Sequence, residues 1–283
     1  MKSRAWMLSV FVMANAAISS SAWAQTAPSA AVVTAPASSV QDDPGILVPA
    51  EPDVVVVNLP TAMRMPLFKG NFRLTHRFGG NLRNGSFSEQ AGNLFGLDQG
   101  AIIGFEYRMA VARDVQAAFY RSSFAKTIQL YGKYDGLRQR GSMPVSVSGL
   151  ISIEGANNFQ EQFAPAVGVV ISRLVGTRIA AYVTPMWVAN TDANDDGSST
   201  AYVGFGGRVR IAGTTYVAAE VAVRAGGYAP DEAAYGFSLE KRAGGHTFSL
   251  TFTNTFGTTF AQMARGGAAN SLYLGFNLSR KFF

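Results

Sequence analysis

Residues 101–111 read AIIGFEYRMAV, and this stretch decides the fold. Its odd-numbered positions are all apolar or aromatic, whereas its even-numbered positions from 104 onward hold Gly, Glu, Arg and Ala. A period of two places successive side chains on opposite faces of a β-strand, so the stretch predicts a strand with one apolar face. The same alternation recurs in residues 201–211, 215–224, 247–253 and 272–279.

The second face of these segments distinguishes a membrane barrel from a soluble sandwich. It carries mainly Gly, Ser, Thr and Tyr, and the whole chain has only 15% charged but 48% hydrophobic residues. A water-facing strand would carry many Lys and Glu residues, whereas a barrel in lipid has an apolar outside and a polar inside. We therefore expect an all-β protein, a transmembrane antiparallel β-barrel, with a soluble barrel or sandwich as the alternative. The absence of Cys excludes disulfide-stapled folds, Cys-based zinc sites and lipoprotein anchors.

The spacing of the alternating segments predicts about twelve strands, an even number as in bacterial single-chain barrels. Tight turns alternate with longer loops, so both chain ends should lie on the side of the turns, which we expect to be the periplasm. The boundaries between residues 122 and 144 fit this scheme least well. The expected strands are 70–79, 100–111, 115–122, 125–134, 144–154, 164–175, 177–189, 200–211, 214–225, 235–242, 246–256 and 271–283.

The N-terminal residues 1–24 have the pattern of a cleaved signal peptide, with a basic start, an apolar stretch and small residues before Gln25. An uncleaved anchor is the alternative, although the apolar stretch is shorter than a membrane span. Residues 25–59 contain acidic but no basic residues and predict a flexible, disordered periplasmic tail. Within it, the apolar run 54–59 is compatible with an extra strand, a plug or a loosely docked linker. Residues 60–283 are assigned to the barrel.

The last strand ends directly at Phe283, an aromatic residue. Such a terminal strand is what the outer-membrane barrel-assembly machinery recognises in many barrels, so we expect that machinery to be a partner. The apolar face of the strand runs through Leu278 and Phe282 rather than Phe283, which is a departure from the usual pattern.

Three short motifs stand out in the barrel segment: Thr75-His76-Arg77-Phe78-Gly79, Phe95-Gly96-Leu97-Asp98-Gln99-Gly100-Ala101, and Arg121-Ser122-Ser123 followed by Lys126-Thr127. Together they resemble those of an uncharacterised family of predicted bacterial outer-membrane β-barrel proteins. The resemblance covers most of residues 70–283. It implies a barrel in the cell outer membrane of a Gram-negative bacterium and implies no activity.

The strand alternation also predicts which charged side chains point into the barrel. We expect a positive lumen, and Arg208 and Arg210 should dominate it because they neighbour Gly204 and Gly206, where the wall is thin. Arg208 is also expected to lie diagonally across from Glu220. These residues form either a structural network or a small pore that prefers anions. The candidate pore-lining residues are Arg73, Arg77, Glu106, Arg108, Lys133, Arg208, Arg210, Glu220, Arg224 and Glu240, with Glu154 as a further inward acid.

Three functions remain open at this stage. The sequence favours a narrow passive channel for small anionic solutes. Twelve strands enclose a lumen intermediate in width between that of eight-stranded barrels, which side chains fill, and that of sixteen-stranded barrels, which is open. A non-conducting structural barrel is the close alternative. A lipid hydrolase is third and least supported; it would use His76 on the lipid-facing wall with Ser122 or Ser271.

The expected partners are outer-membrane lipid and possible small solutes. No nucleic acid is expected, since the basic residues are spread singly through apolar strands. The segment Asp192–Gly197 matches only half of a calcium loop, so we interpret it as an acidic outer loop. No cofactor and no metal site is predicted.

Overall fold

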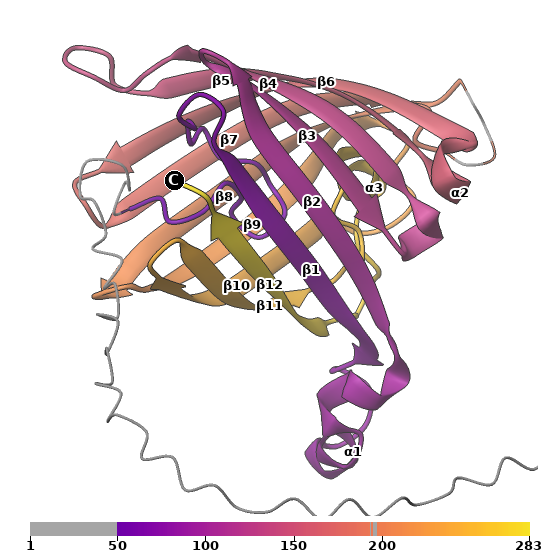
Figure 1. Cartoon of the computed structure of the whole chain (residues 1–283). Helices are drawn as coiled ribbons and strands as arrows, with labels where there is room; N and C mark the ends of the chain where they lie inside the picture. Colours follow the sequence, from indigo (N-terminus) through magenta and orange to yellow (C-terminus); the bar gives the residue numbers. More distant parts are fainter. Residues whose placement is uncertain (1–49, 193, 195–196) are drawn as a thin grey trace, which may run out of the picture. The chain divides into compact units, whose positions relative to one another are not determined.

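The alternating segments form twelve antiparallel strands that close into a barrel within residues 50–192, 194 and 197–283, the part of the chain that this computed structural model describes (Figure 1). Each strand pairs with its neighbour in the sequence, and β1 pairs with β12 to close the ring. The strands are β1 (Gly70–Asn81), β2 (Ala101–Ala112), β3 (Val115–Ser122), β4 (Ile128–Leu137), β5 (Ser146–Gly155), β6 (Glu161–Val175), β7 (Ile179–Ala189), β8 (Ser199–Ala212), β9 (Thr215–Gly227), β10 (Ala234–Ala243), β11 (His246–Thr253) and β12 (Tyr273–Lys281).

The two faces of the barrel wall differ as the sequence predicts. In β2, Phe105 and Tyr107 are 46% and 47% exposed on the outside, whereas Glu106 and Arg108 are 3% and 1% exposed on the inside. Exposed Phe, Leu, Ile, Val and Trp side chains occur on the outer face of strands throughout the ring. An apolar outer surface of this extent is stable in lipid rather than in water, and the closed ring leaves no unpaired strand edge.

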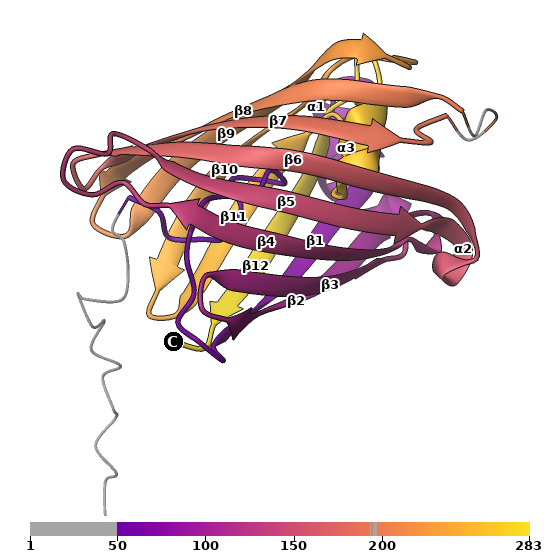
Figure 2. The same cartoon turned by 90° about the horizontal axis from the view of Figure 1, so that it is seen from above.

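Short connections lie at one end of the barrel, here called the turn end, and longer ones at the opposite loop end. Figure 2 shows the C-terminus at the turn end, and α2 and α3 toward the other. The loop end carries α1 (Phe87–Gly92), the 3-10 segments η1 (Leu94–Gln99) and η2 (Phe124–Lys126), α2 (Ala156–Phe159) and α3 (Phe260–Arg265). None of the helices in the described chain is long and apolar enough to cross a membrane.

The predicted strand boundaries agree with the observed ones to within three residues, including the difficult region 122–144. There, β4 begins at Ile128 rather than at residue 125, because a tight turn precedes it. The Ser122 amide donates a hydrogen bond to the Thr127 carbonyl at 2.8 Å, and Ala125 and Lys126 adopt φ values of 49° and 48°. Because β4 also ends later than predicted, at Leu137, the β4–β5 connection spans residues 138–145 and is longer than the other connections at the turn end.

A described segment that precedes β1 lies inside the barrel. Residues 50–63 are all buried, and residues 50–66 are called the plug below. The residues 54–59 are therefore a plug, one of the three arrangements that the sequence left open. The flexible tail predicted for residues 25–59 is therefore too long, because its residues 50–59 are buried in the barrel. The predicted signal peptide, and the tail up to residue 49, lie outside the described residues.

The C-terminal residue resolves the unusual alternation of the last strand. Leu278 and Phe282 face outward with 40% and 49% exposure, whereas Phe283 is partly buried and packs against the cluster that contains Val54, Val55 and Met63. Phe283 therefore follows the alternation and contacts the plug rather than the membrane.

Candidate functional site

The plug enters the lumen at the turn end, reverses direction and returns to the same end. Val55 and Pro60 form a β-bridge, and the Val56 amide donates to the Leu59 carbonyl at 2.8 Å. Residues 56–59 are therefore a tight turn, here called the tip, which points toward the middle of the barrel. Its side chains Val56 and Leu59 join the hydrophobic cluster of the lumen.

The tip binds a single wall carboxylate. Glu220 in β9 accepts hydrogen bonds from the amides of Val57, Asn58 and Leu59, all at 2.9 Å. The carboxylate is 5% exposed and makes no ion pair among the described residues. Three convergent N–H donors can stabilise a buried carboxylate in place of a cation, because hydrogen bonds to a charged acceptor are the strong ones. Glu220 thus binds the plug through its backbone amides.

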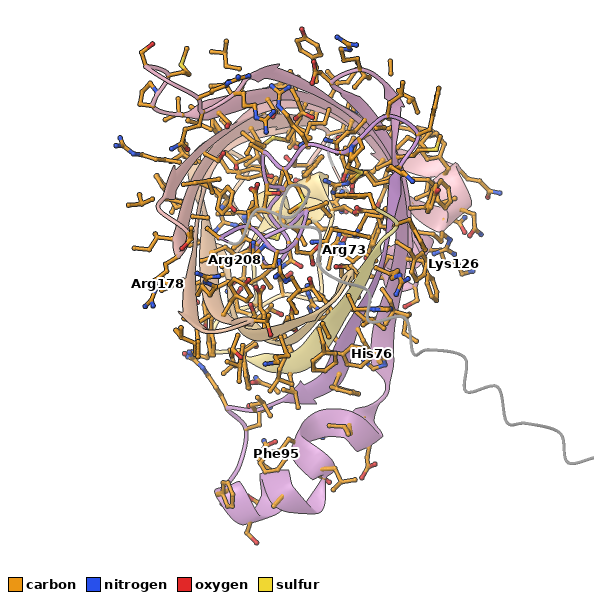
Figure 3. The ribbon with its side chains drawn as sticks, turned by 60° about the vertical axis from the view of Figure 1, so that its left-hand side comes forward. Arg73, His76, Phe95, Lys126, Arg178 and Arg208 are labelled. Carbon is orange, nitrogen blue, oxygen red and sulfur yellow. The ribbon has the colours of Figure 1, made fainter. Side chains whose placement is uncertain are left out.

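Arg208 in β8 binds both the wall and the plug. Its Nε donates to Glu240 at 2.7 Å, and its Nη2 donates to the Val55 and Val56 carbonyls at 2.7 and 3.1 Å. The predicted diagonal placement of Arg208 and Glu220 is confirmed, because Gly206 pairs with Glu220 and Arg208 with Ala218. The two side chains form no ion pair, however, since Glu220 is occupied by the tip and Glu240 is the partner of Arg208. Figure 3 shows Arg208 and Arg73 within the ring of strands.

A second group of wall residues surrounds the plug, and two of its arginines, Arg77 and Arg108, donate to Asn58 Oδ1 and to the Val54 carbonyl. Glu106 pairs with Arg73 and Arg108, each at 2.9 Å, and Arg108 also lies over the Tyr131 ring at 5.0 Å. Arg77 donates to the Asn58 side chain at 2.9 Å. Wall cations therefore contact plug carbonyl and amide oxygens as well as wall acids.

The returning arm of the plug is bound in the same way near the turn end. Lys133 donates to the Met63 carbonyl at 2.7 Å and pairs with Asp135 at 2.9 Å. On the entering arm, Lys281 donates to the Pro52 carbonyl, and Tyr182 donates to Glu51 at 2.9 Å. Burial raises the pKa of Glu51, while the Tyr182 hydrogen bond and the charge of Lys133 oppose that increase.

The buried formal charges of the described chain balance only when the plug is included. Seven basic and seven acidic side chains are buried, and two of the acids, Glu51 and Asp53, belong to the plug. The wall alone therefore has an excess of two positive charges. The basic residues are Arg73, Arg77, Arg108, Lys133, Arg208, Arg242 and Lys281, and the wall acids are Glu106, Asp135, Glu154, Glu220 and Glu240.

The glycines of β8 make room for the plug. A Cβ atom on Gly204 would lie 2.8 Å from Leu59 Cδ1, and one on Gly206 would lie 3.0 Å from Val56 Cγ2. Both approaches are closer than ordinary van der Waals contact. The wall is thin here, as the sequence predicts, but the space is filled by the tip.

We expect Gly204→Val to displace the tip, because overpacking of a filled site costs about 1–3 kcal/mol. A single cysteine introduced by Val54→Cys, in a chain that otherwise has none, should then react with a maleimide roughly tenfold faster. Gly207→Val is the matched control, since a Cβ atom at this position meets no atom within 4 Å. Equal labelling rates in both variants would show that Gly204 does not hold the tip in place.

A second segment fills the loop end of the lumen. Residues 254–268, here called the inner loop, carry α3, whose residues 260–264 are all buried. Glu154 in β5 accepts from the Thr259 hydroxyl at 2.9 Å and from the Ala261 amide at 3.2 Å. The Phe260 ring packs edge-on against Tyr131 with ring centroids 5.5 Å apart. The inner loop therefore narrows the lumen independently of the plug.

The structure places eight of the ten candidate pore-lining residues in the buried lumen. Arg210 and Arg224 are the other two, and both lie at a rim. Arg210 donates to Thr177 in the β6–β7 turn at 3.0 Å, and Arg224 donates to the Arg265 carbonyl in the inner loop at 2.7 Å. Their role in solute passage stays a prediction. Asp135, Arg242 and Lys281 were missed, although all three lie on the inward face of their strands.

The residues of the hydrolase hypothesis are not brought together. His76 lies on the outer face, stacked on Phe276 with a centroid distance of 4.8 Å, whereas Ser122 is 1% exposed on the inner face. Ser271 precedes β12 and contacts Asn81, several residues along the wall from the His76–Phe276 pair. A nucleophile and its base must lie within hydrogen-bond distance, so these three residues form no catalytic pair.

Part of the predicted acidic outer loop lies outside the described residues, which include Asp192 and Asn194 but neither Asp195 nor Asp196. Asp192 accepts a hydrogen bond from the Asn194 amide at 2.9 Å. Within the described ranges, no group of three or more His, Asp or Glu side chains is placed to hold a metal ion.

Several solved structures are similar to this chain at low sequence identity. The NanC porin shares 9% identity with a TM-score of 0.46, over 76% of this chain and 99% of the porin. An outer membrane channel from Pseudomonas putida F1 shares 10% identity with a TM-score of 0.45, over 77% and 97% of the two chains. A mutant porin of Rhodopseudomonas blastica shares 14% identity with a TM-score of 0.34, over 64% of this chain and 55% of that porin. No curated protein matches the sequence.

A family model described as a membrane bound beta barrel domain matches residues 53–282. The match begins within the plug, at Asp53, and includes all twelve strands. The chain therefore belongs to this family of membrane-bound β-barrels (DUF5777).

Proposed function

We propose that this protein is an outer-membrane β-barrel that is closed at rest and passes small anions only after the plug has left the lumen. Both chain ends would then face the periplasm, and the C-terminal strand would be read by the barrel-assembly machinery. The observation that carries the proposal is the binding of the plug backbone by charged wall residues, above all Glu220 and Arg208. A permanently open passage would require a free lumen, and here two segments fill it.

The charge of the wall supports a preference for anions. With the plug in place, the buried formal charges are equal in number, whereas the wall alone has two more basic than acidic groups. If the plug leaves the lumen, it takes with it Glu51, Asp53 and the carbonyl oxygens that bind Arg208 and Lys133. Cations that line a constriction favour the passage of anions.

A reversible lock of the plug tests the proposal. A Cβ on Gly206 would lie 3.6 Å from Val56 Cβ, within the 3.5–4.5 Å that a disulfide requires. The double variant Val56→Cys/Gly206→Cys contains the only two cysteines of the chain, so only one intramolecular bridge can form. We expect single-channel conductance in a planar bilayer under reducing conditions and its loss on oxidation. The two single-cysteine variants are the controls and should not respond to oxidant.

A non-conducting structural barrel is the second candidate, and the inner loop favours it because it fills the lumen even without the plug. If neither the wild-type protein nor the reduced double variant conducts, this second function is supported. If the oxidised double variant still conducts, displacement of the plug is not the opening step.

A further inference from the structure

The two ends of the barrel differ in surface charge: basic side chains dominate the turn end, whereas acidic and basic side chains are nearly equal in number among the described residues of the loop end. Ten exposed or half-buried basic residues surround the turn end, where, among described residues, the one surface acid is Asp114, which pairs with Arg64. Five of them form a continuous group, called the arginine patch below: Arg138, Arg140, Arg173, Arg178 and Arg210. Among described residues, the surface of the loop end carries six acids, Glu89, Asp98, Glu161, Asp192, Asp231 and Glu232, and five basic residues, Arg83, Arg121, Lys126, Arg224 and Arg265.

Backbone and amide contacts hold the arginine patch together. The side chain of Gln139 exchanges two hydrogen bonds with the backbone of Leu174, at 2.7 and 2.8 Å, so Arg138 and Arg140 lie beside Arg173 at the end of β6. The Arg210 amide donates to the Arg178 carbonyl at 2.7 Å, which joins the end of β8 to the β6–β7 turn. Figure 3 shows Arg178 on the outside of the barrel.

The arginine patch borders the apolar outer wall. Leu137, Val175 and Ile179 are 47%, 51% and 42% exposed, and each lies within two residues of an arginine of the patch in the sequence. Val209 and Ile211, the outward-facing neighbours of Arg210 in β8, are 41% and 51% exposed, while Arg210 itself lies at the rim and reaches Thr177 in the β6–β7 turn. The arginines therefore lie where the lipid-facing surface ends, at the level of the headgroups, where long basic side chains reach the interface.

We propose that the arginine patch binds the phosphate of anionic phospholipids in the leaflet on the side of the chain ends. Guanidinium groups bind phosphate oxygens in a bidentate manner, and the adjoining aliphatic side chains contact the acyl chains of the same lipid. This combination selects an anionic lipid over a free anion, which would gain nothing from the apolar border. The inference is independent of whether the lumen conducts.

The test measures lipid binding to the full-length mature protein in a zwitterionic detergent. A fluorescent phosphatidylglycerol is titrated, with a matched phosphatidylethanolamine as the neutral comparison. We expect tighter binding of phosphatidylglycerol and a loss of roughly tenfold or more in affinity for Arg173→Gln/Arg178→Gln, since each basic residue near an anionic surface contributes about 1 kcal/mol. The matched control is Arg121→Gln/Lys126→Gln at the loop end, which should retain the wild-type affinity.

Three results would overturn the proposal. The first is equal affinity for the two lipids, and the second is an equal loss of phosphatidylglycerol affinity in both double variants. The third is complete displacement of the lipid by inorganic phosphate at constant ionic strength. The last result would assign the arginine patch to free phosphate. Heat-modifiable migration on gels confirms that each variant forms a barrel, and Arg173→Lys/Arg178→Lys, which keeps the charge, should bind better than the glutamine variant.

Discussion

Replacing Glu220 with glutamine is expected to release the plug. The amide has one acceptor oxygen in place of two, and its NH₂ group would face the amides of residues 57–59, which bind the carboxylate at 2.9 Å. Leaving one buried donor unpaired and removing the charge should cost about 2 kcal/mol or more. This corresponds to a roughly thirtyfold higher fraction of released plug. The maleimide labelling rate of Val54→Cys in the Glu220→Gln background measures that fraction.

Glu89→Gln is the matched control for this experiment. Glu89 also binds a backbone amide and a hydroxyl, those of Ser86 at the start of α1, but it is exposed at the loop end, away from the lumen. We expect it to leave the labelling rate at position 54 unchanged. An unchanged rate in Glu220→Gln would show that the carboxylate does not determine the position of the plug.

Deleting residues 25–66 is expected to give a barrel that conducts and prefers chloride. The wall then retains seven buried basic and five acidic side chains, since Glu51 and Asp53 have been removed. The inner loop remains, so the conductance should be small. The reversal potential in a potassium chloride gradient measures the preference, and heat-modifiable migration confirms that the barrel is closed.

Adding Arg208→Ser/Arg210→Ser to the deletion should reduce or reverse the chloride preference. Loss of Arg208 also leaves the Glu240 carboxylate, now 2.7 Å from the guanidinium, without its cation. The control is Arg178→Ser, which removes an arginine from the outer surface. A reversal potential that is the same with and without Arg208 would contradict the assignment of the lumen charge, and a silent deletion variant would show that the inner loop closes the barrel by itself.

The strands could be predicted closely because the information for them is local. Alternation within β2, with Phe105 outward and Glu106 inward, reflects two different solvents on the two faces of one strand. The error at β4 has a local cause as well. The turn before Ile128 depends on positive φ values at Ala125 and Lys126, residue types that give no glycine or asparagine signal for such a conformation.

The lumen was predicted as a set of side chains but not as a set of contacts. Inward orientation follows from alternation, which placed Arg73, Arg108 and Arg208 correctly inside. The pairing partners depend on which strands are neighbours and on what else enters the lumen. The sequence therefore placed Arg208 diagonally across from Glu220, as the register confirms, but gave no sign that the tip of the plug occupies Glu220 and that Arg208 binds Glu240.

The sequence by itself determined the architecture: a closed antiparallel barrel with an apolar outside, a charged inside and an excess of inward arginines. Only the tertiary structure decided that the lumen is filled, because the contacts that fill it join residues far apart in the chain. Val57 and Glu220 are separated by 163 positions, and no periodicity spans that distance. The composition of the apolar run 54–59 does not distinguish a solvent-exposed segment from one in a lumen. Its position depends on contacts with distant residues: the space left by Gly204 and Gly206 and the hydrogen bonds to Glu220.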